Sequence, residues 1–203
     1  YGLSEASSAT HMAPYPQGAP MGSVGVPLPD VQAKIMDLET GRHECAPGEV
    51  GEMVIKGPQV MKGYWNQPGL TAEKLRDGWL YTGDLARVDQ DGFFYLVDRK
   101  DDMIISHGFN VYPGQIEELL KEHPAVRDAA VVGVDDQLRG QAIVAVVALK
   151  EGALVKKDEL KAYCKDRLPD YRLPKSILIR EVIPRDPAGK LLRRVLRQDI
   201  AGA

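Results

Sequence analysis

Four short segments of the sequence combine residue types that could do chemistry. In Tyr81-Thr-Gly-Asp84, a carboxylate follows a glycine where a strand runs into a loop. An ionised carboxylate has two acceptor oxygens, so Asp84 can accept hydrogen bonds from both hydroxyls of a vicinal diol. The same four residues are typical of a solvated turn. On this segment alone, Asp84 is either a diol-binding residue or a turn residue.

The other three segments leave similar pairs of alternatives. Tyr1-Gly-Leu-Ser-Glu5 offers an aromatic face, a hydroxyl and a carboxylate, or forms an ordinary turn. In Ala188-Gly-Lys190 the glycine lets the backbone approach an anion while the ammonium supplies a movable point charge. This triplet lacks the preceding glycine of a phosphate-binding P-loop. The charged run Asp98-Arg-Lys-Asp-Asp102 is typical of a solvated linker, with a binding segment as the alternative.

The composition is that of an ordinary globular protein, and it argues against several classes. The 203 residues include 26 Lys and Arg against 29 Asp and Glu, a formal charge of −3, which disfavours a dedicated nucleic-acid-binding protein. Cys45 and Cys164 lie far apart, predict neither a disulfide framework nor a zinc site, and favour a reducing compartment, the cytoplasm. The longest apolar run, Ala142 to Leu149, is shorter than the ~18 residues that span a bilayer. It predicts no transmembrane segment and leaves a peripheral membrane contact open.

The first half of the chain has the pattern of a β-rich domain. Residues 31–36 and 51–56 alternate in polarity as strands do. Residues 79–88 and 93–97 are predicted to pair across the turn at 89–92. A short helix is predicted over 70–75, with Thr71 as its N-cap. The fold expected here is a distorted β-barrel or sheet, and residues 1–30 are loop-rich.

The second half has the pattern of a small α+β domain of about 100 residues. Its first helix begins at Pro113 and carries Ile116, Leu119 and Leu120 on one face. The further predicted elements are strands at 129–134 and 142–149, a helix at 157–168, a strand at 177–182 and a last helix at 190–199. The domain boundary is predicted near residues 98–102.

Taken in order, these segments resemble the C-terminal part of the adenylate-forming superfamily, which comprises acyl-CoA synthetases, luciferases and peptide-synthetase adenylation domains. Tyr1 to Glu5 matches the family pattern Y-G-x-[ST]-E, and Gly57 to Tyr64 and Gly78 to Asp84 match its central signatures. Asp98 to Pro113 resembles its hinge signature and Pro184 to Arg194 its terminal lysine signature. The run Gly108-Phe-Asn-Val-Tyr-Pro113 is similar to medium- and long-chain fatty acyl-CoA synthetases. Ile105 stands where peptide-synthetase domains typically have a lysine, and His107 departs from the small residue usual before this glycine.

The resemblance implies an ATP-dependent acid–CoA ligase with two half-reactions, in which a fatty acid is first adenylated and coenzyme A then displaces AMP. In the nucleotide site it implies six residues. Tyr1 and Leu96 would pack on the two faces of adenine, Asp84 would bind both ribose hydroxyls with Arg99 close by, Ser4 would bond a phosphate oxygen, and Glu5 would hold Mg²⁺.

The resemblance also implies a moving C-terminal domain. It implies a large adenylating domain that ends at residue 98, a hinge at 99–102 with Asp101 as its pivot, and a mobile domain over 103–203. Lys190 would bridge the substrate carboxylate and the phosphate in the first half-reaction. Gly108 would line the pantetheine tunnel in the second. Arg193 and Arg194 would be free to meet the phosphates of coenzyme A, with a solvated last helix as the alternative role for at least one of them.

Elements of the family that lie upstream of Tyr1, the phosphate loop and the acyl pocket, are not found in the sequence. We therefore expect a piece of a longer protein that is inactive by itself. Residues 1–30 are expected to be poorly ordered or to pack on another chain, because their family partners belong to the upstream domain. Two alternatives stay open: a non-catalytic binding module, and an adenylation domain acting on another carboxylic acid.

Overall fold

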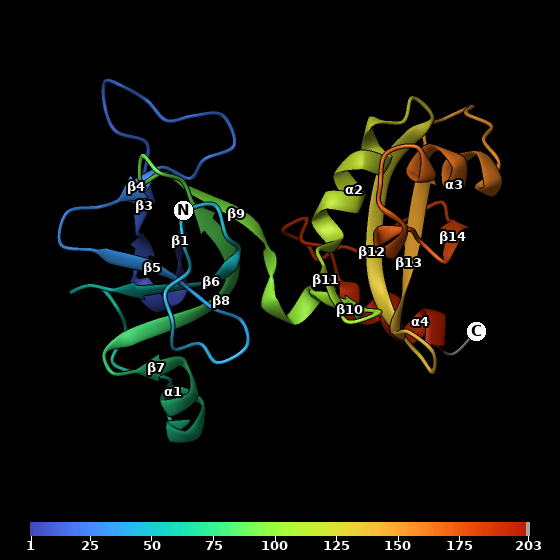
Figure 1. The fold of residues 1–203 in the computed structure, drawn as a ribbon. Helices are drawn as coiled ribbons and strands as arrows, with labels where there is room; N and C mark the ends of the chain where they lie inside the picture. Colours follow the sequence, from blue (N-terminus) through green and yellow to red (C-terminus); the bar gives the residue numbers. More distant parts are fainter. Residues whose placement is uncertain (202–203) are drawn as a thin grey trace. The chain divides into compact units, whose positions relative to one another are not determined.

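The computed structural model describes residues 1–201, which form two compact units (Figure 1). The first unit is Tyr1–Lys100, and the second comprises the described residues from Asp101 on. The first is a β-rich unit around a curled sheet and the second is a mixed α+β unit. The predicted fold class, a distorted sheet followed by a small α+β domain, is confirmed.

The first unit is built around a five-stranded antiparallel sheet. Its strands are β5 (Gln32–Met36), β6 (Gly51–Lys56), β7 (Leu75–Arg76), β8 (Trp79–Val88) and β9 (Phe94–Arg99). The order is β5-β6-β8-β7, and β9 also pairs with β8. The β8–β9 hairpin closes where it was predicted, because the Asp89 side chain accepts the amide hydrogens of Asp91 and Phe93.

Residues 1–30 pack on this sheet through short elements: β1 (Gly2–Leu3), η1 (Ser4–Ala6), β2 (Ser8–Ala9), β3 (His11–Met12) and β4 (Val26–Pro27). The Val24 amide donates to the Phe94 carbonyl, and the Phe94 amide donates to the Gly25 carbonyl. His11 is 2% exposed, and its ring lies 4.7 Å from that of Phe94. The prediction that these residues are poorly ordered or pack on another chain is therefore wrong. The loop-rich sequence hid backbone pairing with a distant strand.

The helix of the first unit begins earlier than predicted. α1 spans Pro68–Lys74, with proline in its first turn and Gln67 as the N-cap. The prediction of Thr71 as the cap is wrong, because Thr71 lies within the helix and its hydroxyl donates a hydrogen bond to the Gln67 carbonyl.

The second unit has a five-stranded mixed sheet of β10 (Ile104–Ser106), β11 (Phe109–Val111), β12 (Val126–Asp136), β13 (Gly140–Leu149) and β14 (Ser176–Ile179). The order is β11-β10-β13-β12, and β14 pairs with β13 in parallel. Its helices are α2 (Pro113–Glu122), α3 (Lys157–Lys165) and α4 (Arg193–Ala201). The 3-10 turns are η2 (Lys100–Asp102), at the junction of the two units, and η3 (Asp170–Arg172).

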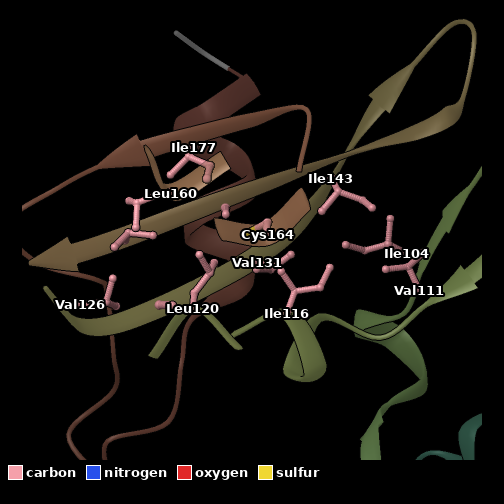
Figure 2. Close-up of a cluster of buried hydrophobic side chains, with 13 residues drawn as sticks. Ile104, Val111, Ile116, Leu120, Val126, Val131, Ile143, Leu160, Cys164 and Ile177 are labelled. Atoms are coloured by element: carbon pink, nitrogen blue, oxygen red, sulfur yellow. The ribbon is translucent and has the colours of Figure 1, made fainter. Parts of the chain in front are cut away.

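Helices cover both faces of this sheet because its central strands are apolar on both sides. Along β12, Ala129 and Val131 face a cluster that includes Ile116 and Leu120 of α2 and Leu160 of α3 (Figure 2). The alternate residues of β12 face a second cluster, which contains Leu196 of α4. The predicted face of α2 is confirmed at Ile116 and Leu120, both fully buried, whereas Leu119 is half-buried.

Two differences from the predicted elements concern the candidate site. The last helix begins at Arg193 rather than at residue 190, so Lys190 lies in the turn before it. The hairpin β10–β11 was not predicted, because strands of three residues are too short to show a period. The strand at 177–182 also ends sooner, at Ile179.

Candidate functional site

Asp84 lies in a bulge of β8. The pairing of β6 with β8 shifts between Glu52 and Val54, where one residue of β6 faces residues 82–84 of β8. Gly83 sits there at φ +74°, a left-handed conformation that glycine adopts without strain. Bulges bend a strand and re-aim its side chains. The glycine that precedes Asp84 is therefore the local reason why this carboxylate leaves the regular alternation of the strand.

The Asp84 carboxylate is shared between a guanidinium and a phenol. Its Oδ1 accepts a hydrogen bond from Arg99 Nη1 at 2.7 Å, and its Oδ2 accepts one from the Tyr1 hydroxyl. Burial raises the pKa of the Tyr1 hydroxyl above its usual range, and the bond to Asp84 raises it further. Tyr1 is therefore a neutral donor at physiological pH. Three residues predicted for one nucleotide site, distant in sequence, are thus in contact in the first unit.

Glu52 supports this turn from the neighbouring strand, and sequence reasoning missed it. Glu52 is 4% exposed, and its Oε1 accepts a hydrogen bond from the Gly83 amide at 3.0 Å. Its Oε2 accepts a hydrogen bond from Lys100 Nζ at 2.7 Å. The signal that could have found it is a carboxylate in an otherwise buried strand, because a buried charge needs partners.

Glu5 is held by a tyrosine from one of the central signatures. The Tyr64 hydroxyl donates to Glu5 Oε1 at 2.9 Å, and the Met61 amide donates to the Glu5 carbonyl at 2.7 Å. Burial, followed by the bond to Glu5, raises the pKa of Tyr64. The other carboxylate oxygen of Glu5 has no hydrogen-bond partner among residues 1–201. One available carboxylate oxygen fits Mg²⁺, which takes one or two carboxylates and completes its shell with phosphate oxygens and water.

Beside Tyr1 an open hollow of about 670 Å³ is lined by residues 1–4 and 7–9. Ser4 belongs to η1 and is exposed, and its hydroxyl has no hydrogen-bond partner among the described residues. Leu96, on β9, is 43% exposed. A large apolar side chain at that exposure is free to pack on a planar ligand.

Lys190 lies in a tight turn of the second unit. Its amide donates to the Asp186 carboxylate at 2.8 Å, and its carbonyl accepts the Asp186 amide hydrogen at 2.9 Å. Arg185 stabilises this turn, because its guanidinium donates hydrogen bonds to both carboxylate oxygens of Asp128 and to the Gly189 carbonyl. The Lys190 ammonium makes no ion pair or hydrogen bond within residues 1–201. The backbone of Lys190 is thus fixed by the turn, while its ammonium has no partner among the described residues.

Gly108 occupies the second position of the two-residue turn between β10 and β11. His107 and Gly108 have φ +52° and +80°, the pattern of a type I′ hairpin turn. The His107 amide donates to the Arg139 carbonyl at 2.9 Å. His107 therefore occupies a left-handed position that glycine adopts without the steric cost of a Cβ.

Arg193 has a structural role in the second unit. Its guanidinium donates to both oxygens of Glu117, each at 2.8 Å, and to Asp102 at 3.3 Å. Its side chain is 15% exposed. The expectation that Arg193 is free to meet a ligand phosphate is therefore wrong, whereas Arg194 is exposed.

The predicted residues thus fall into two groups. Tyr1, Ser4, Glu5, Asp84, Leu96 and Arg99 lie in the first unit, and Asp101, Gly108 and Lys190 lie in the second. Tyr64, Glu52 and Arg185, which hold these residues in place, were not predicted.

Comparison with known proteins identifies the family. The family model of the AMP-binding enzyme matches residues 1–65, and that of the AMP-binding enzyme C-terminal domain matches residues 115–190. The chain belongs to the AMP-binding enzyme family. The two matches lie in different units and together include Tyr1, Glu5 and Lys190.

Individual members of this family are similar along nearly the whole chain. A long-chain-fatty-acid–CoA ligase of Bacillus subtilis is 48% identical over 98% of this chain and 35% of the relative. A 2-succinylbenzoate–CoA ligase of Geobacillus kaustophilus is 44% identical over 98% of the chain and 40% of the relative. The crystal structure of ATP-bound MatB from Rhodopseudomonas palustris superposes with a TM-score of 0.93 at 35% identity, covering 98% of this chain and 39% of that one.

The chain therefore spans 35% to 40% of the length of these two relatives. Among the described residues, no helix is long and apolar enough to cross a membrane.

Proposed function

We propose that this chain is the C-terminal part of an AMP-forming acid–CoA ligase whose acid substrate is a long-chain fatty acid. The observation that carries the proposal is that a chain of the AMP-binding enzyme family has both a buried Asp84 held by Tyr1 and Arg99 and a Lys190 whose ammonium has no partner among residues 1–201. The similarity to a long-chain-fatty-acid–CoA ligase, at 48% identity, supports the acid.

In the first half-reaction, the substrate carboxylate attacks the α-phosphate of ATP and pyrophosphate leaves. Asp84 accepts hydrogen bonds from the two ribose hydroxyls, and Arg99 pairs with its carboxylate and orients it. Tyr1 and Leu96 lie against the adenine, and Ser4 donates to a phosphate oxygen. Glu5 would hold Mg²⁺, which neutralises phosphate charge when bound.

Lys190 brings a positive charge to the point where two anions meet. The carboxylate and the α-phosphate repel each other until a cation lies between them, and a fixed cation stabilises the transition state most where water is excluded. At ~4 Å and an effective dielectric near 20, one such contact contributes about 4 kcal/mol before desolvation is subtracted.

In the second half-reaction, the thiolate of coenzyme A attacks the acyl carbon and AMP leaves. Lys190 is not needed in this step, because the two anions of the first step are already joined. We propose that the second unit, residues 103–203, turns about Asp101 within the hinge at 99–102 and presents the Gly108 turn to the pantetheine arm. The absence of a Cβ at Gly108 allows that arm to approach closely.

A second candidate for the acid substrate is 2-succinylbenzoate, because a ligase for that acid is nearly as similar to this chain. The 2-succinylbenzoate–CoA ligase of Geobacillus kaustophilus is 44% identical to this chain, only slightly less than the fatty-acid ligase. The residues that would contact the acid are not among those argued above, so the nucleotide and lysine residues serve both candidates equally.

The test is ATP–pyrophosphate exchange by the full-length gene product with a panel of acids. Fatty acids of increasing length are compared with 2-succinylbenzoate and amino acids. Exchange that depends on a long-chain fatty acid is the expected result. Exchange with 2-succinylbenzoate alone would overturn the fatty-acid assignment, and no exchange with any acid would favour the remaining alternative, a non-catalytic binding module.

Two further properties are part of the proposal. The 203-residue chain alone is expected to bind ATP weakly and to form no acyl-CoA. A cytoplasmic location rests on Cys45 and Cys164, both of which are free thiols.

A further inference from the structure

A second cation lies beside the turn that carries Asp84. We propose that Lys74 is a further residue of the nucleotide site, whose ammonium attracts the phosphates of a bound nucleotide and so makes the site discriminate between ligands by their charge. This role rests on the proposed function, because it concerns the nucleotide whose ribose Asp84 would bind.

The Lys74 ammonium lies over Gly83, the residue that precedes Asp84. A Cβ at Gly83 would lie 3.9 Å from Lys74 Nζ and 3.7 Å from Arg99 Nη2. Apart from Gly83 and its chain neighbours, no other heavy atom of residues 1–201 comes within 4 Å of that position. Because consecutive Cα atoms are about 3.8 Å apart, the ammonium is within about 10 Å of the Asp84 Cα. Two cations thus line a small open notch in the bulge of β8.

The backbone of Lys74 is held against the sheet at the end of α1. The Thr71 hydroxyl accepts the Tyr64 amide hydrogen at 2.9 Å, and the Leu75 amide donates to the Thr71 carbonyl. Leu75 begins β7 and pairs with Leu80 of β8. Lys74 is therefore fixed between a helix and a strand that both lie on β8, and only 27% of its side chain is exposed.

The Lys74 ammonium is only weakly paired within the described part of the chain. Its one ion pair there is with Glu73 at 3.8 Å, which is beyond hydrogen-bond distance, and the Glu73 side chain is 61% exposed. Exposed pairs of this kind contribute little and are screened by salt. The charge of Lys74 is therefore available to an anionic ligand beside Asp84.

The ligand that fits this position is the phosphate chain of a nucleotide. Asp84 would bind the ribose, and the phosphates are attached to that same ribose. The Asp84 carboxylate repels them, and a nearby cation reduces this repulsion. A lysine acts as a point charge rather than as a planar fork, so it attracts phosphate without fixing its orientation. Lys74 is accordingly expected to favour ATP over AMP, and AMP over adenosine.

The test is isothermal titration of adenosine, AMP and ATP with the full-length gene product, without added Mg²⁺. Lys74→Met keeps an apolar stem and removes the charge. At an ionic strength near 0.01 M, where the Debye length is about 30 Å, the affinity is expected to fall about tenfold for ATP, about threefold for AMP and not at all for adenosine. At about 1 M salt most of this difference is expected to disappear.

Two further variants separate the charge of Lys74 from its place in the fold. Lys74→Arg keeps the charge and is expected to restore each affinity to within about twofold of the wild type. Lys34→Met removes a cation of β5 that pairs with Glu44 at 2.8 Å. Since β5 and β7 are the two ends of the strand order, this control is expected to leave all three affinities unchanged.

The possible outcomes distinguish this role from the alternatives. A lysine in the last turn of a helix also interacts with the helix dipole, and that role predicts a lower melting temperature and no dependence on ligand charge. Equal losses for adenosine and ATP, or no loss for any ligand, would overturn the proposal for Lys74 and leave the proposed function standing. If the wild type bound no nucleotide, the proposed function and the role of Lys74 would both be rejected.

Discussion

The turn that carries Asp84 and the turn that carries Lys190 differ in whether the functional side chain has partners of its own. Asp84 is 8% exposed, its carboxylate is held by Arg99 and Tyr1, and its backbone amide donates a hydrogen bond to the Thr82 hydroxyl. The Lys190 backbone is held as firmly, by Asp186, but its ammonium is exposed and unpaired within residues 1–201. A group that recognises one fixed ligand benefits from preorganised partners. In the proposed mechanism Lys190 acts in only one of the two steps, so its ammonium must be able to leave, and partners of its own would compete with the ligand.

The largest expected effect is that of Lys190→Ala. Adenylate formation by the full-length gene product is expected to fall about 10²–10³-fold, the cost of losing one transition-state donor. Thioester formation from supplied acyl-adenylate is expected to stay within a few fold. Because the side chain makes no contact within the described residues, the melting temperature is expected not to change. Equal losses in the two half-reactions would show that Lys190 serves both.

The free energy of unfolding of the first unit is expected to depend on pH through His11, because burial lowers the pKa of this residue to about 4 from 6.5. Between those values the unfolded chain binds the proton and the folded chain does not, so the free energy of unfolding falls as the pH falls. The expected loss from pH 6.5 to 4 is about 3 kcal/mol. His11→Gln, which does not titrate, is expected to flatten this slope in urea unfolding at several pH values. A slope unchanged by the substitution would assign it to other groups.

Asp84→Asn sharpens the comparison from the nucleotide side. The amide keeps the shape but loses the charge that pairs with Arg99, and an NH₂ group, which donates, replaces one of the two acceptor oxygens. Nucleotide affinity is expected to fall by about 1.5–3 kcal/mol, the value of a hydrogen bond to a charged group. Isothermal titration with AMP on the full-length gene product measures this loss. As a control, Lys34→Met should bind AMP as the wild type does; a similar loss there would point to a general fold effect.

The smallest expected effect is that of His107→Gly. His107 adopts φ +52°, which a residue with a Cβ reaches at a cost, while glycine gives up more freedom on folding. The net gain in the free energy of unfolding is expected to be below about 1 kcal/mol. Chemical denaturation of the 203-residue chain checks it, with His107→Ala as the control that keeps the Cβ and should not stabilise. A clear destabilisation by glycine would mean that the His107 side chain contributes more than its conformation costs.

The sequence by itself determined the two-part fold and the types of residue in the site. Alternation in strands 51–56 and 79–88, the turn at 89–92 and the apolar face of Ile116 and Leu120 are local patterns, so they could be read without the structure. The candidate residues, including Asp84 and Lys190, stood in ordered motifs and needed no contact to be found.

Only the tertiary structure decided which residues hold those motifs in place. Glu52 meets Gly83 and Lys100, and Arg193 meets Glu117 and Asp102, across separations of tens of residues. No local period encodes such pairs, because the side chains involved are charged and fit a solvated surface equally well. The packing of residues 1–30 on Phe94 was missed for the same reason: backbone pairing between distant segments leaves no pattern in either one.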